Sequence, residues 1–302
     1  MDFSFSREHE LLRRMIREFA RNEVAPIAAE IDAEERVPFE VLKKAAQVGL
    51  MGVPFPQKYG GAGAGEIGYC ILMEEMNKVC GSTATIIGAH TGIGAMAIYL
   101  DGTEEQKQKY LVPLARGEKL AAFALTEANA GSDAAAIQTR AVRDGDYFIL
   151  NGSKIWITNG DIADVLTVFA VTDPALGARG GVTAFIVEKT FPGFRTGTKE
   201  TKMGIRGSST AEVVFEDCRV PAENVLGQFG AGFLTALKTL DVGRISLGAG
   251  CLGGAQAALE LSIDFAKSRY QFGEPVAQKQ AIQWMIADMA TEIEALRSLV
   301  YR

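Results

Sequence analysis

Histidine and paired cysteine are scarce in this chain, and their scarcity argues against a metal centre. The 302 residues include two histidines and four cysteines, namely His9, His90, Cys70, Cys80, Cys218 and Cys251. No two cysteines form the C-x-x-C pair that structural zinc sites and redox motifs use. We therefore predict no metal site. We interpret the four thiols as buried apolar side chains of a protein in a reducing compartment, the cytoplasm.

The chain has no excess of positive charge. Lys and Arg total 31, whereas Asp and Glu total 37, so the formal net charge is −6. Proteins that bind phosphate backbones need a clustered basic surface. We therefore expect no nucleic-acid partner.

A membrane segment is also not expected. Residues 79–100 carry no charge and are long enough to cross a bilayer, but they contain four glycines and several hydroxyl side chains. We interpret them as buried helices of a soluble protein. The N-terminus, MDFSFSREHELL, lacks the apolar core of a secretory signal and the Arg/Ser-rich character of a transit peptide.

What is present is a change of hydrophobic period along the chain, which predicts an α+β protein. Residues 1–120 have helical spacing, as in Leu12, Ile16 and Phe19, and a capping box at residues 103–106. Residues 121–228 alternate like strands, and residues 229–302 are helical again. We expect an N-terminal all-α domain, a middle antiparallel β domain, and a C-terminal helical bundle that is incomplete in this chain.

The middle region has strong turn signals. Asp144-Gly145 and Asn151-Gly152 are dipeptides of two-residue hairpins, so residues 138–158 predict a three-strand antiparallel meander. The segments VLTVFAV, VTAFIVE and AEVVFED predict further strands.

The C-terminal region predicts two long helices, over residues 230–268 and 276–302. Their apolar faces are wide and need a cover. The cover is either further chain or another subunit.

Two glycine-rich segments compete as a nucleotide site. Gly63, Gly65 and Gly68 spell G-x-G-x-x-G, but VPFPQKYG before them is not a strand, so we interpret this segment as a loop. The second segment, FALTEANAGSD, runs from a strand into a turn whose glycine permits close approach to a ligand. Taken alone, the segment favours an ordinary polar turn over a ligand site.

The strand SKIWITNG strengthens the second candidate. Trp156 has the shape to cover one face of an aromatic ring system, and Thr158 is able to donate a hydrogen bond to a ring nitrogen. Taken alone, however, a tryptophan on a strand more often lies in the core.

Five segments together resemble the acyl-CoA dehydrogenase family, with the short-chain, butyryl-type branch as the nearest. They are ALTEANAGSD, SKIWITNG, KMGIRGSST, GFLTALKTLDVGR and SRYQFGEPVAQKQAIQ. Ala128 stands where the family usually has proline. The resemblance implies a helical domain over residues 1–120, a flavin-binding β domain over 121–228, a truncated helical domain over 229–302, and FAD between the last two.

The resemblance also implies roles for individual residues. The expected FAD contacts are Phe123, Ala124, Leu125, Thr126, Gly131, Ser132, Trp156, Ile157 and Thr158. The expected contacts to the FAD of a neighbouring subunit are Arg269, Phe272 and Gln280. The expected substrate contacts are Ser132, Asp241, Val242, Gly243 and Arg244. Without the resemblance, Asp241 and Arg244 form an ordinary i, i+3 ion pair and Arg269 is a solvated helix-end arginine.

The implied reaction is FAD-dependent α,β-dehydrogenation of a short- to medium-chain acyl-CoA to a 2-enoyl-CoA. The implied partners are acyl-CoA, an electron-transfer flavoprotein and further copies of the chain in a homotetramer. We assign no catalytic base: the family's late Y-E-G-[TS] segment is expected beyond Arg302, the alternative position is Gly243, and Glu127 resembles a structural partner of the loop. A non-catalytic FAD or acyl-CoA-binding protein and a flavin oxidase or monooxygenase remain alternatives.

Overall fold

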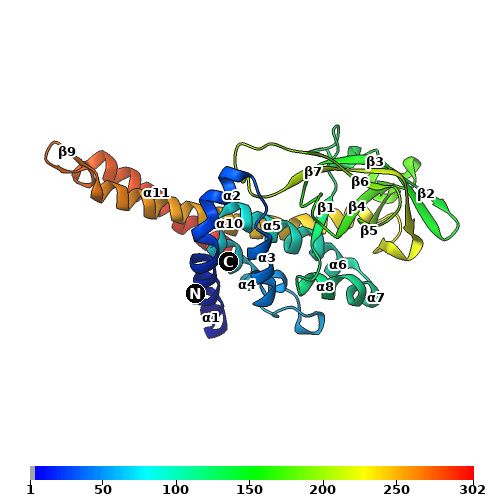
Figure 1. Ribbon diagram of the computed structural model, residues 1–302, viewed down its shortest axis with the longest axis horizontal. Helices are drawn as coiled ribbons and strands as arrows, with labels where there is room; N and C mark the ends of the chain where they lie inside the picture. The colour runs from blue at the N-terminus through cyan, green and yellow to red at the C-terminus, as the bar shows by residue number, and fades with distance from the viewer. Residues whose placement is uncertain (1–3) are drawn as a thin grey trace.

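The N-terminal part of the molecule is helical in the computed structural model, which describes residues 4–302 (Figure 1). Short π-helical and 3-10 turns join its helices. These helices are α1 (Arg7–Phe19), α2 (Ala28–Glu34), α3 (Phe39–Gln47), α4 (Gly65–Asn77), α5 (Gly81–Gly88), α6 (Met96–Asp101), α7 (Glu104–Gln106) and α8 (Val112–Ala115).

Local sequence explains how these helices begin and pack. The Ser6 side chain caps α1, and the predicted stripe turns Ile16 fully inward. The predicted capping box is confirmed: Thr103 Oγ1 accepts from the Gln106 N–H at 3.2 Å, and Gln106 Oε1 accepts from the Thr103 N–H at 3.1 Å. The segment Gly81–Asp101 is apolar and long enough to cross a membrane, and 72% of its most apolar window is buried inside the protein.

A buried histidine joins this helical part to the sheet. His90 Nε2 donates to the Leu114 carbonyl at 3.1 Å, and Nδ1 accepts from the Ala121 N–H at 2.9 Å. This pattern requires the neutral ring. Burial lowers the pKa of His90 from 6.5 to about 4.

We expect this histidine to make the fold acid-sensitive. A group whose pKa is lowered in the folded state contributes stability above its unfolded pKa, and that stability is lost as the pH falls from 6.5 towards 4. The loss is about 3 kcal/mol, at about 1.4 kcal/mol per unit. Urea unfolding between pH 4 and 7 measures it. The variant His90→Gln should lose this part of the pH dependence, whereas His9→Gln should keep it; equal slopes in both variants would contradict the assignment.

The middle part is one eight-stranded sheet in the order β6-β7-β3-β2-β4-β5-β8, with β1 pairing with β4. The strands are β1 (Ala121–Ala124), β2 (Arg140–Asp144), β3 (Tyr147–Thr158), β4 (Val165–Val171), β5 (Val182–Glu188), β6 (Phe194–Lys199), β7 (Thr210–Pro221) and β8 (Val225–Leu226). The predicted strands VLTVFAV, VTAFIVE and AEVVFED are confirmed. The sheet is mainly antiparallel, but β4 pairs in parallel with both β1 and β2.

The predicted three-strand meander is wrong: residues 140–158 form two strands. Asp144 pairs with Tyr147, so the hairpin loop is Gly145-Asp146, with the left-handed φ of +58° at Gly145. Asn151-Gly152 does not turn the chain but lies inside β3, at a register shift against β7. A Cβ at Gly152 would lie 2.7 Å from Thr139 Oγ1, so the bulge accommodates glycine but no larger residue without a shift.

The C-terminal part is a helical hairpin. Helix α10 (Gly232–Ser268) crosses the body of the molecule and continues beyond it, and α11 (Gln280–Val300) returns along it (Figure 1). Their connection contains β9 (Tyr270–Gln271) and β10 (Glu274–Pro275). As predicted, their apolar faces are incompletely covered: Leu261, Phe265, Trp284 and Leu299 are all more than 60% exposed. Helix α11 starts at Gln280, later than residue 276, because residues 276–278 form a 3-10 turn.

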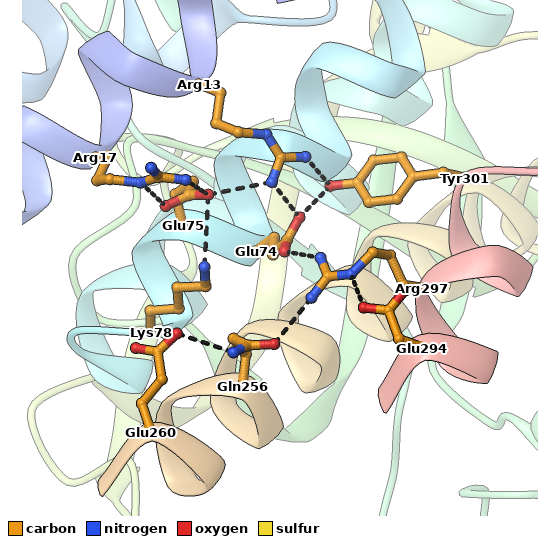
Figure 2. Close-up of polar contacts among 10 residues, drawn as sticks. All are labelled: Arg13, Arg17, Glu74, Glu75, Lys78, Gln256, Glu260, Glu294, Arg297 and Tyr301. Atoms are coloured by element: carbon orange, nitrogen blue, oxygen red, sulfur yellow. Dashed lines mark hydrogen bonds and ion pairs between the residues drawn. The ribbon is translucent and has the colours of Figure 1, made fainter. Parts of the chain in front are cut away.

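A network of charged and polar side chains fastens the end of α11 to α4 and α1 (Figure 2). Glu74 is fully buried and accepts from Arg13 Nη1 at 3.0 Å, Arg297 Nη1 at 2.5 Å and Tyr301 Oη at 2.6 Å. Burial opposes the charge of Glu74, but these three donors outweigh it, and the pKa of Glu74 lies below its ordinary value. The network therefore sets how α10 and α11 lie against the N-terminal helices.

The expectation that all four thiols are buried is wrong for one of them. Cys70, Cys80 and Cys218 are buried, whereas Cys251 on α10 is exposed. Its neighbours Gly250 and Leu252 are buried, so this turn of α10 is covered on one side only, and the apolar pattern does not show that Cys251 lies on the other side.

Candidate functional site

A cavity of about 460 Å³ lies between the sheet, α10 and the N-terminal helices. The loop after β1 and the end of β3 contribute most of the polar atoms. The lining residues predicted from sequence are Phe123, Leu125, Thr126, Gly131, Ser132, Trp156, Ile157, Thr158 and Arg244. Two separate segments, FALTEANAGSD and SKIWITNG, are thus brought together around one space.

Trp156 faces this cavity and does not belong to the core. Its side chain is 61% exposed, so the alternative of a core tryptophan does not hold. The reason is a bulge: Lys154 pairs with Val213 and Ile157 with Ala211, so two β3 residues oppose one on β7. Trp156 in this bulge has a φ of +57°, a conformation that is uncommon for a residue with a bulky side chain.

Glu127 fixes the loop after β1, which lines the same cavity. Its carboxylate accepts from the Lys154 ammonium at 2.7 Å, from Thr139 Oγ1 at 2.6 Å and from two backbone N–H groups, those of Gln138 and Thr139. Burial opposes its charge, but the attraction of Lys154 prevails and the pKa of Glu127 is lowered. Burial lowers the pKa of Lys154 to about 8. A carboxylate with all these partners is suited to structural support rather than to proton transfer.

A second cavity, of about 540 Å³, adjoins the first. Ile93, Thr158, Leu240 and Arg244 line both. The rest of the second wall comes from α4, α5, α10 and the loop before β7, and is largely hydrocarbon and glycine. Its further members are Met73, Asn77, Thr85, Gly88, Ala89, Gly92, Ile205, Gly243, Ser246, Leu247, Gly250, Cys251 and Gly254. Among the residues described, no carboxylate lines this second cavity.

The four residues of the predicted substrate segment, 241–244 on α10, point to different sides of the helix. Arg244 lines both cavities, and Gly243 lines the second, where a Cβ would lie 2.9 Å from Ile93 Cγ2. Val242 packs against the core instead. Asp241 lines neither cavity; its carboxylate pairs with Arg244 Nη1 at 3.2 Å on the exposed surface, which is the ordinary i, i+3 ion pair considered above.

Four predicted cofactor contacts do not line the cavities of this chain. Ala124 is fully buried in the sheet. Arg269, Phe272 and Gln280 are exposed at the far end of the α10–α11 hairpin, near β9, away from the sheet (Figure 1). If these three residues contact a cofactor, it is one held by another subunit, as the resemblance implies.

Sequence reasoning missed several lining residues, among them Ile93, Phe233, Leu237, Leu240 and Ile205. The helical ones belong to regular apolar patterns, and pattern alone does not distinguish a cavity wall from the core. Leu237 is the residue that the sequence could have indicated, because it lies one helical turn before the predicted Asp241–Arg244 segment.

The fold and site define a class: a protein with a helical domain, a β-sheet and long C-terminal helices, whose cavities lie where the three parts meet. Comparison with known proteins gives the family. The N-terminal, middle and C-terminal domain models of acyl-CoA dehydrogenase match residues 6–118, 122–218 and 230–302. The chain belongs to the acyl-CoA dehydrogenase family, a family of FAD-dependent oxidoreductases that act on CH–CH donors.

Individual relatives cover the whole chain. A short-chain specific acyl-CoA dehydrogenase of Clostridium acetobutylicum is 54% identical over 302 residues, which is 100% of this chain and 79% of that protein. The structure of butyryl-CoA dehydrogenase from Megasphaera elsdenii matches with a TM-score of 0.97 and 44% identity, over 100% of this chain and 79% of that one. A structure described as the electron transferring flavoprotein of Acidaminococcus fermentans matches with a TM-score of 0.98 and 48% identity, with the same coverage.

Proposed function

We propose that the protein binds FAD and catalyses α,β-dehydrogenation of short- to medium-chain acyl-CoA thioesters to 2-enoyl-CoA. The observation that carries the proposal is the pair of adjoining cavities. One is lined by hydroxyls, a turn and an exposed tryptophan, and the other is lined mainly by hydrocarbon. The two share Thr158 and Arg244, so a planar cofactor and an acyl chain would meet at these residues.

The residues of the first cavity fit FAD. Trp156 presents an exposed indole, which suits the face of a fused aromatic ring. Thr126, Ser132 and Thr158 offer hydroxyl donors of the kind that ring heteroatoms and phosphates accept. A Cβ at Gly131 would have no atom within 4 Å, so the turn leaves open space for a ligand. We propose that Phe123, Leu125, Thr126, Gly131, Ser132, Trp156, Ile157 and Thr158 hold the cofactor.

The second cavity would position the substrate and exclude water from it. Its hydrocarbon wall favours an acyl tail over solvent. Arg244, exposed at the border of both cavities, would contact the CoA moiety next to the thioester, whose carbonyl oxygens accept from a guanidinium. FAD, when bound, supplies the acceptor for the hydrogen that leaves the β carbon. We assign abstraction of the α proton to no residue of this chain.

The exposed surface and the family also support the partners that we propose. The exposed apolar side chains of α10 and α11 favour burial against further copies of the chain, and the family suggests a homotetramer. Arg269, Phe272 and Gln280 at the far end of the hairpin would then reach the FAD of another subunit. We further propose an electron-transfer flavoprotein as the electron acceptor. The four free cysteines suit the cytoplasm, the location that we propose.

The central experiment is anaerobic reduction of the bound flavin. The full-length gene product should be yellow when purified, and C4 to C16 acyl-CoAs should bleach its absorbance, with the best rate for a short or medium chain. A protein that takes up no FAD contradicts the proposal. Bound FAD that no acyl-CoA reduces favours a non-catalytic binding protein, and rapid reoxidation of the reduced flavin by air favours an oxidase.

Trp156 permits a direct test of the cofactor site. We expect Trp156→Ala to weaken FAD binding roughly tenfold, because the aromatic contact with the ring is lost. Titration of the apoprotein with FAD in a calorimeter measures this. Phe39 on α3 is another exposed aromatic residue, 55% exposed, and it lines neither cavity, so Phe39→Ala is the matched control. Equal FAD affinity in the two variants would remove Trp156 from the site.

A further inference from the structure

Ile205, in the loop before β7, has an unusual backbone. Its φ is +53°, in the left-handed region that β-branched residues rarely adopt. Its side chain is 48% exposed, and it lines the second cavity. Strained residues of this kind persist where the surrounding structure determines their conformation.

Contacts made by the residues that follow Ile205 hold its backbone in this conformation. The Ile205 carbonyl accepts from the Ser208 N–H at 3.1 Å and from Ser208 Oγ at 3.0 Å, which closes a tight turn. The next residue, Arg206, donates to Glu35 Oε1 at 2.7 Å and so fastens the loop to the end of α2.

The contact with the N-terminal helices continues at Gly207. Its N–H donates to Ser82 Oγ at 3.1 Å, and a Cβ there would lie 1.9 Å from Ile31 Cγ2. No larger residue fits at this position without a shift. The loop is therefore docked closely on α2 and α5, with Ile205 held at the cavity.

The position of Ile205 in the cavity wall is distinctive. Nearly all of the lining comes from the N-terminal helices and α10. Between residues 121 and 228, Thr158 and Ile205 are the two lining residues, and Thr158 is polar and shared with the first cavity. Ile205 is therefore the hydrocarbon surface that the β part offers opposite the helical walls.

We propose that Ile205 is a specificity-determining residue, which contacts the hydrocarbon tail of the acyl thioester and closes the second cavity on its β-domain side. This inference rests on the proposed function. Because the loop is docked, the side chain is present before substrate binds, and the strain at Ile205 is the cost of that preorganised wall.

The test compares ligands with and without a tail. The FAD-loaded protein is titrated by calorimetry with CoA, S-butyl-CoA and S-octyl-CoA, which are not oxidised. We expect Ile205→Gly, which relieves the backbone and removes the wall, to weaken binding of both alkyl thioethers about tenfold and to change CoA binding less than twofold. In steady-state assays of the full-length gene product, KM for butyryl-CoA should rise more than kcat falls. Met203→Ala alters a fully exposed residue of the same loop that does not line the cavity, so it should behave like the parent.

Each outcome decides the inference. If Ile205→Gly does not fold, Ile205→Asn tests the same point, since Asn tolerates this φ and replaces hydrocarbon by an amide. Unchanged affinity of the alkyl thioethers in these variants overturns the inference, as does a parent protein that binds them no more tightly than CoA. Failure of the proposed function looks different: the parent does not bleach with any acyl-CoA, while tail-dependent binding and its loss at Ile205 persist.

Discussion

Lys154→Met is expected to lower the free energy of unfolding by about 3–5 kcal/mol and to weaken FAD retention. The Lys154 ammonium is fully buried and donates to Glu127 at 2.7 Å and to the Leu125 carbonyl at 3.1 Å. Removing it leaves the Glu127 carboxylate buried without its countercharge, which is the costly way to break a buried pair. The same loop forms the wall of the first cavity, so the loss of support should reach the cofactor.

The matched control is another lysine of the sheet region. Lys189 pairs with Asp164 at 2.8 Å, but its side chain is 44% exposed, so Lys189→Met should cost no more than about 1 kcal/mol. Urea unfolding and the flavin content of the purified variants provide the two measurements. The double variant Lys154→Met/Glu127→Gln should recover part of the loss, because the unpaired charge is then absent. If Lys154→Met costs as little as Lys189→Met, the loop does not depend on this ion pair.

Gly253→Ala is expected to destabilise the protein by about 3 kcal/mol or more. A Cβ at Gly253 would lie 2.0 Å from the Glu74 carbonyl oxygen, so α10 and α4 touch there through their backbones. No side-chain rotation relieves a contact with backbone, and the helices must separate. The separation would also pull on the Glu74 network that holds α11 (Figure 2).

For the adjacent glycine, Gly254, we expect a change in stability of the opposite sign. A Cβ at Gly254 would have no atom within 4 Å, so Gly254→Ala should stabilise α10 by about 0.5–1 kcal/mol through helix propensity. Thermal unfolding of the two single variants measures the difference. If Gly253→Ala does not lower the midpoint, α4 and α10 do not pack as closely as described; if Gly254→Ala lowers it, the Gly254 position is not free.

Local signals explain what could be predicted. The capping box at Thr103, the stripe on α1 and the strands β4, β5 and β7 are encoded within a few residues, so period and capping rules locate them. Five separate motifs indicated the acyl-CoA dehydrogenase family, and the three domain models confirm it. The division at residues 120 and 228 and the individual site roles remain our proposals.

The errors also have physical reasons. Asn151-Gly152 has the composition of a turn, but pairing with β7 on one side and β2 on the other keeps it inside a strand. Cys251 belongs to an apolar helix, but it faces the second cavity, whereas Gly250 and Leu252 on the same turn are buried. In each case the deciding interaction comes from a residue distant in sequence.

The sequence alone determined the order of helical and strand regions, the absence of metal-type motifs and the family, because each is a matter of short-range pattern. Tertiary structure decided that Trp156 is exposed in a bulge, that the Glu127 carboxylate pairs with the Lys154 ammonium, and that Ile205 lines the second cavity together with the helices. These features depend on which segments meet in space, and no local pattern contains that information. The same packing brings Thr158 and Arg244 to the border of two cavities, where the proposed chemistry takes place.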